Sequence, residues 1–178
     1  MKYIDKQSDS INIESTAMKT AYFFLTAFLI LVSCDRGNSE MQGFDPVAER
    51  AKVEQTIRNN LGWAPAKDFE LLESTMWLDS TYLVVNPTDR VAIGEEDFRS
   101  TEEFFRSPYF QAVGFEITDL RINLSKGGDV AWFYCHLNDW NTWKGEPANW
   151  ENARWTGVLE KIDGAWKIRQ MHFSFAHR

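Results

Sequence analysis

Several residue types that build catalytic and metal centres are scarce in this sequence. It holds two cysteines, Cys34 and Cys135, and three histidines, His136, His172 and His177. They form no His-Glu-x-x-His or paired-cysteine pattern. A Gly-x-Ser-x-Gly elbow and a glycine-rich phosphate loop are also missing. The sequence therefore predicts neither a metal site nor a cofactor, and it carries no signature of nucleophilic catalysis.

Positive charge is also in short supply. Against 26 Asp and Glu there are 19 Lys and Arg, which gives a formal net charge of -7. Residues 1–33 carry as many acidic as basic side chains, so this charge belongs to the rest of the chain. An acidic domain without a basic patch argues against nucleic acid as a partner and against electrostatic docking on anionic lipid.

Residues 1–33 are expected to be a leader and a signal peptide rather than part of the fold. Residues 18–34, MKTAYFFLTAFLILVSC, combine a lysine with an apolar run that is short for a bilayer. The ending LVSC resembles a bacterial lipobox, which implies cleavage before Cys34, lipidation of its sulfur and a lipid-anchored place in the bacterial cell envelope. Met18 is the expected start of translation, because a signal peptide does not need the polar residues that precede it. The alternative is an anchor helix with an incidental cysteine.

The rest of the chain is expected to form a tether and one domain. Residues 34–43 are polar and small, as in a linker. Residues 44–178 are enough for a single domain with a full core. If Cys34 carries lipid, Cys135 has no disulfide partner, and its apolar surroundings predict a small buried hydrophobic residue. The membrane link would then rest on the acyl chains alone.

Hydrophobic periodicity and turn residues predict helices first and an antiparallel meander after them. Asp45 and Pro46 are typical of a helix start, and Asp163-Gly164 predicts a two-residue hairpin turn. A bulge is expected near Thr118-Asp119, where the alternation of apolar residues changes phase. This order predicts an α+β fold with helices packed on one face of a curved sheet. The expected helices cover 46–62, 68–76 and 94–108, the last as one helix or two short ones. The expected strands cover 80–87, 115–125, 129–140, 150–162 and 165–176.

Three segments resemble the SnoaL-like branch of the nuclear transport factor 2-like superfamily. They are LDSTYLVVNPTDRVAIGEEDF at 78–98, GGDVAW at 127–132 and RWTGVLEKIDGAWKIRQMHFS at 154–174. The resemblance covers roughly 46–175. It implies a cone in which a strongly curved, mainly antiparallel sheet wraps around N-terminal helices, with a pocket between them. It often implies a homodimer through the outer face of the sheet.

The last strand supplies the main expectation about this pocket. Trp166 and Ile168 are followed in the same alternation by polar residues, so one face is expected to fill the closed end of the cone and then line the pocket. His172 is expected there, either meeting a ligand or as a hydrogen-bonded core histidine. The residues expected to contact a ligand are Gln170, His172, Ser174, Trp132 and Asn86.

Catalytic candidates are fewer. The superfamily includes ketosteroid isomerase, whose aspartate base precedes the proline that ends the first strand. Asn86 matches that position, and an amide cannot take the proton at neutral pH. Asp79 is interpreted as a turn residue, with a pocket carboxylate as the alternative. The remaining candidates for chemistry are His172, Asp79 and Tyr134.

Four tryptophans, Trp140, Trp143, Trp150 and Trp155, gather around one hairpin. Cross-strand packing or burial in a dimer is the favoured interpretation, and stacking on a planar ligand is the alternative. Two functions stay open. One is a lipid-anchored binding or assembly module for a small, largely apolar ligand, which the amide at Asn86 favours. The other is a small hydrolase-, isomerase- or dehydratase-like enzyme that uses His172 in the pocket.

Overall fold

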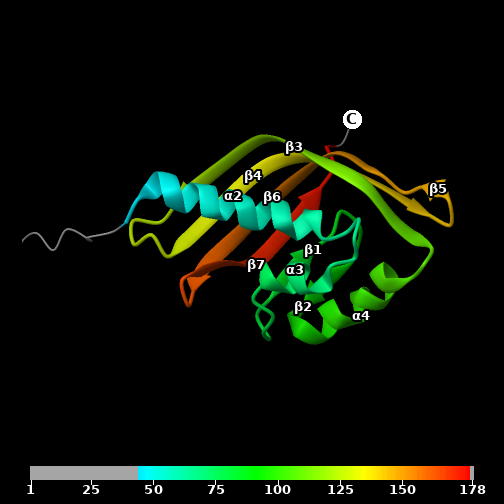
Figure 1. Cartoon of the computed structure of the whole chain (residues 1–178), viewed down its shortest axis with the longest axis horizontal. Coiled ribbons are helices and arrows are strands. Elements are labelled where there is room, and N and C mark those ends of the chain that lie inside the picture. The colour runs from blue at the N-terminus through cyan, green and yellow to red at the C-terminus, as the bar shows by residue number, and fades with distance from the viewer. Residues whose placement is uncertain (1–43, 177–178) are drawn as a thin grey trace, which may run out of the picture. The chain divides into compact units, whose positions relative to one another are not determined.

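The computed structural model describes residues 44–176 and has the predicted order of helices before a meander (Figure 1). The leader, Cys34 and the tether lie outside the described residues. The elements are α2 Pro46–Gly62, α3 Phe69–Ser74, β1 Leu83–Val85, β2 Val91–Ile93, α4 Gly94–Arg106, β3 Phe110–Leu124, β4 Val130–Trp143, β5 Glu146–Pro147, β6 Trp150–Ile162 and β7 Ala165–Ser174.

The strands form one curved, unclosed sheet in the order β2-β1-β7-β6-β4-β3, with β5 paired to β4. β1 runs parallel to β7, and the other pairs are antiparallel. Helix α2 crosses one face of the long strands, while α3 and α4 lie toward the end near β1 and β2 (Figure 1). The predicted α+β cone is confirmed, and the face toward α2 is called the inner face below.

Helix α2 begins as its sequence predicts. The Asp45 carboxylate accepts hydrogen bonds from the backbone N–H groups of Val47 at 2.8 Å and Ala48 at 3.3 Å, which satisfies donors that the helix leaves unpaired. Val53 and Ile57 of this helix are completely buried. Burial of each such side chain contributes roughly 1.5–3 kcal/mol, so the helix is held mainly by packing against the sheet.

A buried carboxylate ties α2 to the sheet. Glu49 accepts a hydrogen bond from Trp166 Nε1 at 2.7 Å and forms ion pairs with Lys161 and Lys52, each at 2.8 Å. The hydrogen bond from Lys161, followed by that from Lys52, lowers the pKa of the Glu49 carboxyl to about 2, against the opposing effect of burial. The carboxylate is therefore satisfied although it is buried.

Two predicted backbone features are confirmed. The β3–β4 register shifts between Thr118 and Arg121, where Asp119 has a φ of 53°, so the bulge lies where the hydrophobic phase changes. Asp163 and Gly164 have φ values of 51° and 81°, as a two-residue turn with two left-handed positions requires. The bulge bends β3, and the turn fixes the register with which β7 enters the sheet.

Candidate functional site

A bulge in β7 decides where the expected pocket residues lie. Leu159 pairs with Ile168 and Val158 pairs with Gln170, so Arg169 is an extra residue without a partner on β6. The Arg169 guanidinium forms ion pairs with Asp79 Oδ2 at 2.9 Å and with Glu160 Oε2 at 3.1 Å. Every side chain after the bulge therefore changes face.

The expectation that His172 shares the face of Trp166 and Ile168 is therefore wrong. Met171 and Phe173 are buried on the inner face, whereas His172 is exposed on the outer face. Gln170 and Ser174 follow His172 to the outer face, because the inserted Arg169 shifts their alternation as well. The last part of β7 thus completes the core with apolar residues and turns its polar residues outward. Whether these polar residues bind a ligand stays a prediction.

Three of the candidates nevertheless meet on the outer face. Trp132, Tyr134 and Gln170 line an open hollow of about 710 Å³ together with Arg121 and Thr156. His172 lies beside it, because it pairs directly with Thr156. We call this feature the outer hollow. These residues lie together on the outer face, whereas the sequence interpretation expected a pocket on the inner face; that they contact a ligand stays a prediction.

Tyr134 belongs to a short chain of polar side chains at the edge of the outer hollow. Its hydroxyl lies 2.6 Å from His136 Nε2, and His136 Nδ1 lies 2.5 Å from Asn152 Oδ1. Since Asn152 Oδ1 can only accept, Nδ1 carries a proton, and in the neutral imidazole Nε2 then accepts from the Tyr134 hydroxyl. The bulge in β6, where Asn152 has a φ of 54°, places this amide beside the imidazole. His136 is thus oriented from both sides.

Asp79 organises a turn, as the favoured interpretation predicted. Its carboxylate accepts from the backbone N–H of Thr81 at 2.8 Å and from the Thr81 hydroxyl at 2.7 Å, and it pairs with Arg169. The hydrogen bonds from Thr81, with the Arg169 guanidinium behind them, hold the pKa of Asp79 well below its usual range. Asn86 follows the end of β1, where its backbone N–H donates to Arg90 O. Neither residue lines the outer hollow.

The inner face carries a carboxyl that the sequence interpretation missed. Along β4 the buried Leu137 is followed at alternate positions by Asp139 and Asn141, so both polar residues point inward. Burial raises the pKa of the Asp139 carboxyl, and a hydrogen bond with the Asn141 side chain opposes this rise. Within residues 44–176, Asp139 forms no ion pair.

Aromatic side chains surround this carboxyl. Asp139 pairs with Phe115 of β3 and with Trp150 of β6, and both of these pack against the core. Farther along β4, Trp143 stacks on Phe104 of α4, with ring centroids 4.7 Å apart and planes 13° apart. We call the region from Asp139 to this stacked pair the mouth of the cone.

Packing accounts for three of the four hairpin tryptophans. Trp143 stacks on Phe104, Trp150 contacts Phe173 edge-on, and Trp155 is completely buried. Trp150 and Trp155 pack against neighbouring strands, as the favoured interpretation predicted, whereas Trp143 packs on a helix. Trp155 also leaves its indole N–H without a hydrogen-bond partner among the described residues.

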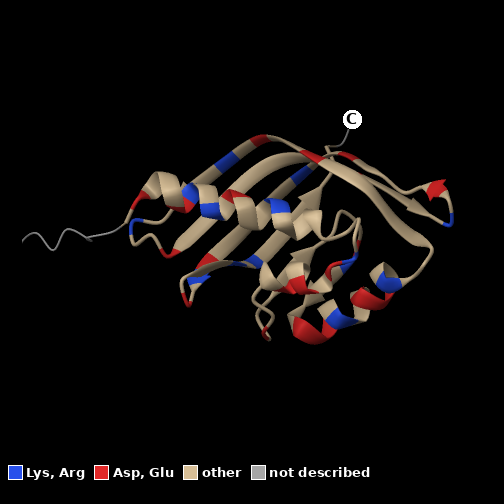
Figure 2. Cartoon of the chain, viewed as in Figure 1, with Lys and Arg blue, Asp and Glu red and all other residues tan. Residues whose placement is uncertain are grey.

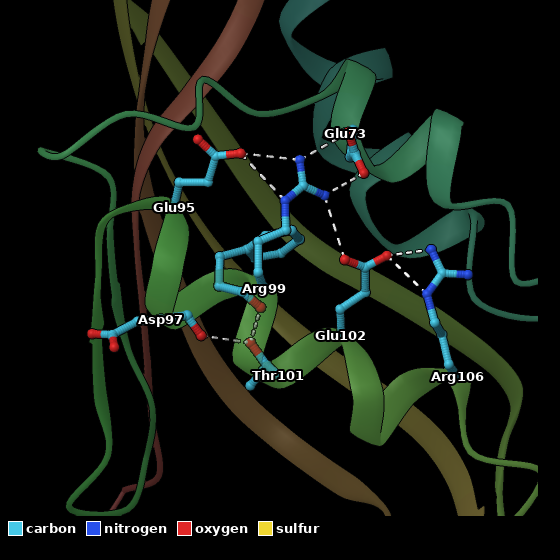
Figure 3. Close-up of polar contacts among 8 residues, drawn as sticks. Glu73, Glu95, Asp97, Arg99, Thr101, Glu102 and Arg106 are labelled. Atoms are coloured by element: carbon cyan, nitrogen blue, oxygen red, sulfur yellow. Dashed lines mark hydrogen bonds and ion pairs between the residues drawn. The ribbon is translucent and has the colours of Figure 1, made fainter.

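Helix α4 is fastened beside the mouth by a charge network. Acidic and basic residues alternate along this helix (Figure 2). The Arg99 guanidinium pairs with Glu73 of α3 at 2.5 Å, with Glu95 at 3.2 Å and with Glu102 at 3.4 Å (Figure 3). Glu102 also pairs with Arg106. The Arg99–Glu73 pair links α4 to α3, whereas the other pairs lie within α4. Ion pairs near the surface each contribute little to stability.

Two further properties hold for residues 44–176. In that range no three His, Cys, Asp or Glu side chains lie together in a group that could hold a metal ion. None of the helices described there is both long enough and apolar enough to cross a membrane.

With this geometry established, the family follows from the sequence. Residues 53–178 match the family model of the SnoaL-like domain. The chain belongs to this family. Solved structures of the nuclear transport factor 2-like superfamily share the fold of this SnoaL-like domain. No curated protein matches the sequence.

Three solved structures illustrate how similar the fold is. A nuclear transport factor 2-like superfamily protein from Salmonella enterica serovar Typhimurium has a TM-score of 0.65 at 13% identity, over 75% of this chain and 95% of that one. A nuclear transport factor 2-like protein from Cytophaga hutchinsonii has a TM-score of 0.57 at 15% identity, over 71% and 98%. A type 2 hexachlorocyclohexane dehydrochlorinase has a TM-score of 0.59 at 16% identity, over 74% and 87%. At these identities the likeness shows the fold alone.

Proposed function

We propose that this chain is a lipid-anchored SnoaL-like domain of the bacterial cell envelope that binds a small, largely apolar molecule at the mouth of its cone. The observation that carries the proposal is Asp139, an inward carboxyl among aromatic residues whose pKa burial raises. A buried carboxyl without an ion pair costs folding free energy, and perturbed carboxyls cluster at functional sites. In its protonated form Asp139 can donate a hydrogen bond to an oxygen atom of a bound molecule.

The surroundings of Asp139 support an apolar ligand. Phe115 and Trp150 offer ring surface on either side of the carboxyl, and Asn141 adds one amide. Few polar groups on a mostly apolar wall are typical of small-molecule sites. The outer hollow does not include Asp139. Phe104 and Trp143, stacked at the mouth, add two more rings to the apolar surface on this side of Asp139.

The test uses 2-acetonaphthone, a neutral, planar probe whose single oxygen can only accept a hydrogen bond, and isothermal titration across a pH series. Asp139→Asn keeps a neutral hydrogen-bond donor, so it should bind the probe at all pH values tested. The unchanged protein should lose affinity as the Asp139 carboxyl ionises with rising pH. Asp139→Leu should bind at least about tenfold more weakly than Asp139→Asn, the loss of one good hydrogen bond. Equal affinity in all three proteins would overturn the proposal.

If the protein is an enzyme, the structure favours Asp139 rather than His172 as the catalytic candidate. His172 is exposed on the outer face, so it cannot act inside the cone. A carboxyl whose pKa is raised by burial can serve as a general acid or base, which suits elimination or isomerisation. Asp139→Asn separates the two functions, because the amide can hold a ligand but cannot transfer its proton. If the unchanged protein turns over a substrate and Asp139→Asn still binds it without turnover, the protein is an enzyme.

Anchoring and self-association complete the proposal. The lipid anchor is supported by the LVSC ending of the apolar stretch. A homodimer is supported by apolar side chains left open to solvent, among them Val113 at 68% and Trp132 at 47% exposure. Both are tested below.

A further inference from the structure

Five aromatic side chains form a continuous cluster at the mouth of the cone, between α4 and the ends of β3 and β4. The ring centroids of contacting members lie 4.7–6.0 Å apart. Two members root the cluster in the protein, because Phe110 is buried and Phe105 packs against the core. We call this cluster the aromatic rim, and its members are Phe104, Phe105, Tyr109, Phe110 and Trp143.

The outer members of the aromatic rim are open to solvent. Phe104 is 45% exposed and Tyr109 is 55% exposed, although the rings of both contact Trp143. Contact with the rooted rings already orders these side chains, so little conformational entropy is lost when a partner covers them. Apolar surface that is left open in this way is typical of a site that meets a protein or a membrane.

The charged residues beside the aromatic rim favour a membrane over a protein. Lys144 Nζ lies 5.4 Å from the centroid of the Tyr109 ring, and Lys67 Nζ lies 6.0 Å from that of Phe110. Lysine is depleted where two proteins meet, whereas lysine and aromatic residues are both common where a protein meets lipid headgroups. Glu146 follows closely after Lys144 in the same hairpin, so the charges there balance and favour an apolar contact with uncharged lipid.

The length of the chain before the domain allows such a contact. Phe44 is ten residues after Cys34, so the connection extends over at most about 35 Å. The Phe44 ring lies against Gly128 in the turn before β4, at the opposite end of the long strands from β5 and the aromatic rim (Figure 1). The 14 residues of β4 span about 46 Å. The aromatic rim therefore reaches a lipid surface that holds Cys34 when the strands lie obliquely along that surface.

We propose that the aromatic rim docks on the lipid surface to which Cys34 anchors the chain. Phe104 and Tyr109 enter the headgroup region, and Lys144 keeps its charge on the water side. The inference rests on the lipid anchor of the proposed function. It differs from the sequence-based expectation that the acyl chains alone hold the protein at a membrane. It places the mouth of the cone beside the phase in which a largely apolar ligand dissolves.

The test couples residues 34–178 through Cys34 to a maleimide phospholipid in phosphatidylcholine vesicles. These residues include the whole compact unit 44–178, and Cys135 is completely buried, so Cys34 is the thiol that reacts. Brominated acyl chains quench tryptophan fluorescence at close range, so brominated vesicles should quench the unchanged protein relative to ordinary ones. Trp143→Phe should lose most of this quenching. Trp77→Phe is the control and should keep it, because Trp77 is also partly exposed but lies beside Ile168 of β7.

Two further variants test the exposed rings. Tyr109→Ser and Phe104→Ser should each reduce the quenching, although the coupling still holds the protein on the vesicle. Val91→Ser is their control, because it removes an exposed apolar side chain of β2, and it should leave the quenching unchanged. Melting curves of each variant establish that it is folded.

Three results would overturn the docking. The first is equal fluorescence of the coupled protein in brominated and ordinary vesicles. The second is quenching that persists in Trp143→Phe and is lost in Trp132→Phe, which would place the outer face of the sheet on the lipid. The third is a dimer that dissociates in Tyr109→Ser, which would assign the aromatic rim to a second copy of the chain. Because the coupling is chemical, these results depend neither on lipidation in the cell nor on the binding of 2-acetonaphthone, so failure of the docking is distinguished from failure of the proposed function.

Discussion

Ile168 and Met171 both point into the core from the same strand, although strict alternation would place them on opposite faces. The bulge at Arg169 lies between them and reconciles the two orientations. It also places Asp79 and Glu160 around the Arg169 guanidinium, so the turn before β1 is tied to the middle of β7.

The first prediction concerns this change of face. Met171→Ala should lower the free energy of unfolding by about 2–5 kcal/mol, because it removes a buried side chain and leaves a cavity. The neighbouring His172→Gln should change it by less than about 0.5 kcal/mol, because His172 is exposed. Urea unfolding followed by tryptophan fluorescence measures both. The reverse order of effects would mean that His172 is the inward residue.

Most of the fold could be predicted because its signals are local. Asp45 and Pro46 start α2, and Asp163-Gly164 makes the hairpin turn, as their conformational preferences require. The bulge at Thr118-Asp119 was also predicted, because the apolar phase changes there. Such signals involve residues that are close in the sequence, so they can be recognised without knowledge of the tertiary structure.

The site could be predicted only in part. The apolar phase also changes in β7, from Trp166 and Ile168 to Met171 and Phe173, and this was the signal for the second bulge. Asp139 was missed because one acidic residue in an aromatic strand has no motif around it. Its pKa is raised by burial, and this burial depends on how the register of three strands places Phe115 and Trp150 opposite it.

The second prediction concerns Glu49. Its folded-state pKa of about 2 lies below the ordinary value of 4.5, so its stabilisation is present above the unfolded-state pKa and is lost as the pH falls toward 2. Glu49→Gln should cost about 1–3 kcal/mol at neutral pH, since charged hydrogen bonds to Lys161 and Lys52 are lost.

Thermal melting across the acid range measures this effect. The difference between Glu49→Gln and the unchanged protein should shrink as the pH is lowered. Glu54→Gln is the matched control, because Glu54 belongs to the same helix but pairs with Arg58 on the surface. A constant difference down to acid pH would contradict the assigned pKa.

The third prediction is that Cys34 carries lipid. Expression in a bacterial host should give a membrane-bound species whose intact mass shows cleavage before Cys34 and added acyl chains. Cys34→Ala removes the sulfur to which the lipid attaches, so it should give an unprocessed or soluble product. Cys135→Ala is the control and should leave the acylation unchanged. A mature membrane species without acyl mass would exclude the anchor.

The fourth prediction is a homodimer. Residues 42–178 should sediment as a dimer at micromolar concentration, since association would cover part of the exposed apolar surface that includes Val113 and Trp132. Equilibrium sedimentation over a tenfold concentration range measures the association. A monomer throughout this range would exclude the homodimer.

The fifth prediction follows from the sign of the Asp139 shift. Because burial raises its folded-state pKa, the folded protein holds this proton more tightly than the unfolded chain does. Stability is therefore lost as the pH rises from the unfolded-state pKa through the folded-state pKa. Asp139→Asn should melt at a higher temperature than the unchanged protein at neutral pH, with the gain disappearing in acid. Asp129 has a lowered pKa through its hydrogen bond with Ser125, so Asp129→Asn should show no such gain. If Asp139→Asn is less stable than the unchanged protein at neutral pH, the carboxylate is held by a favourable contact, and the proposal of a protonated ligand-binding carboxyl fails.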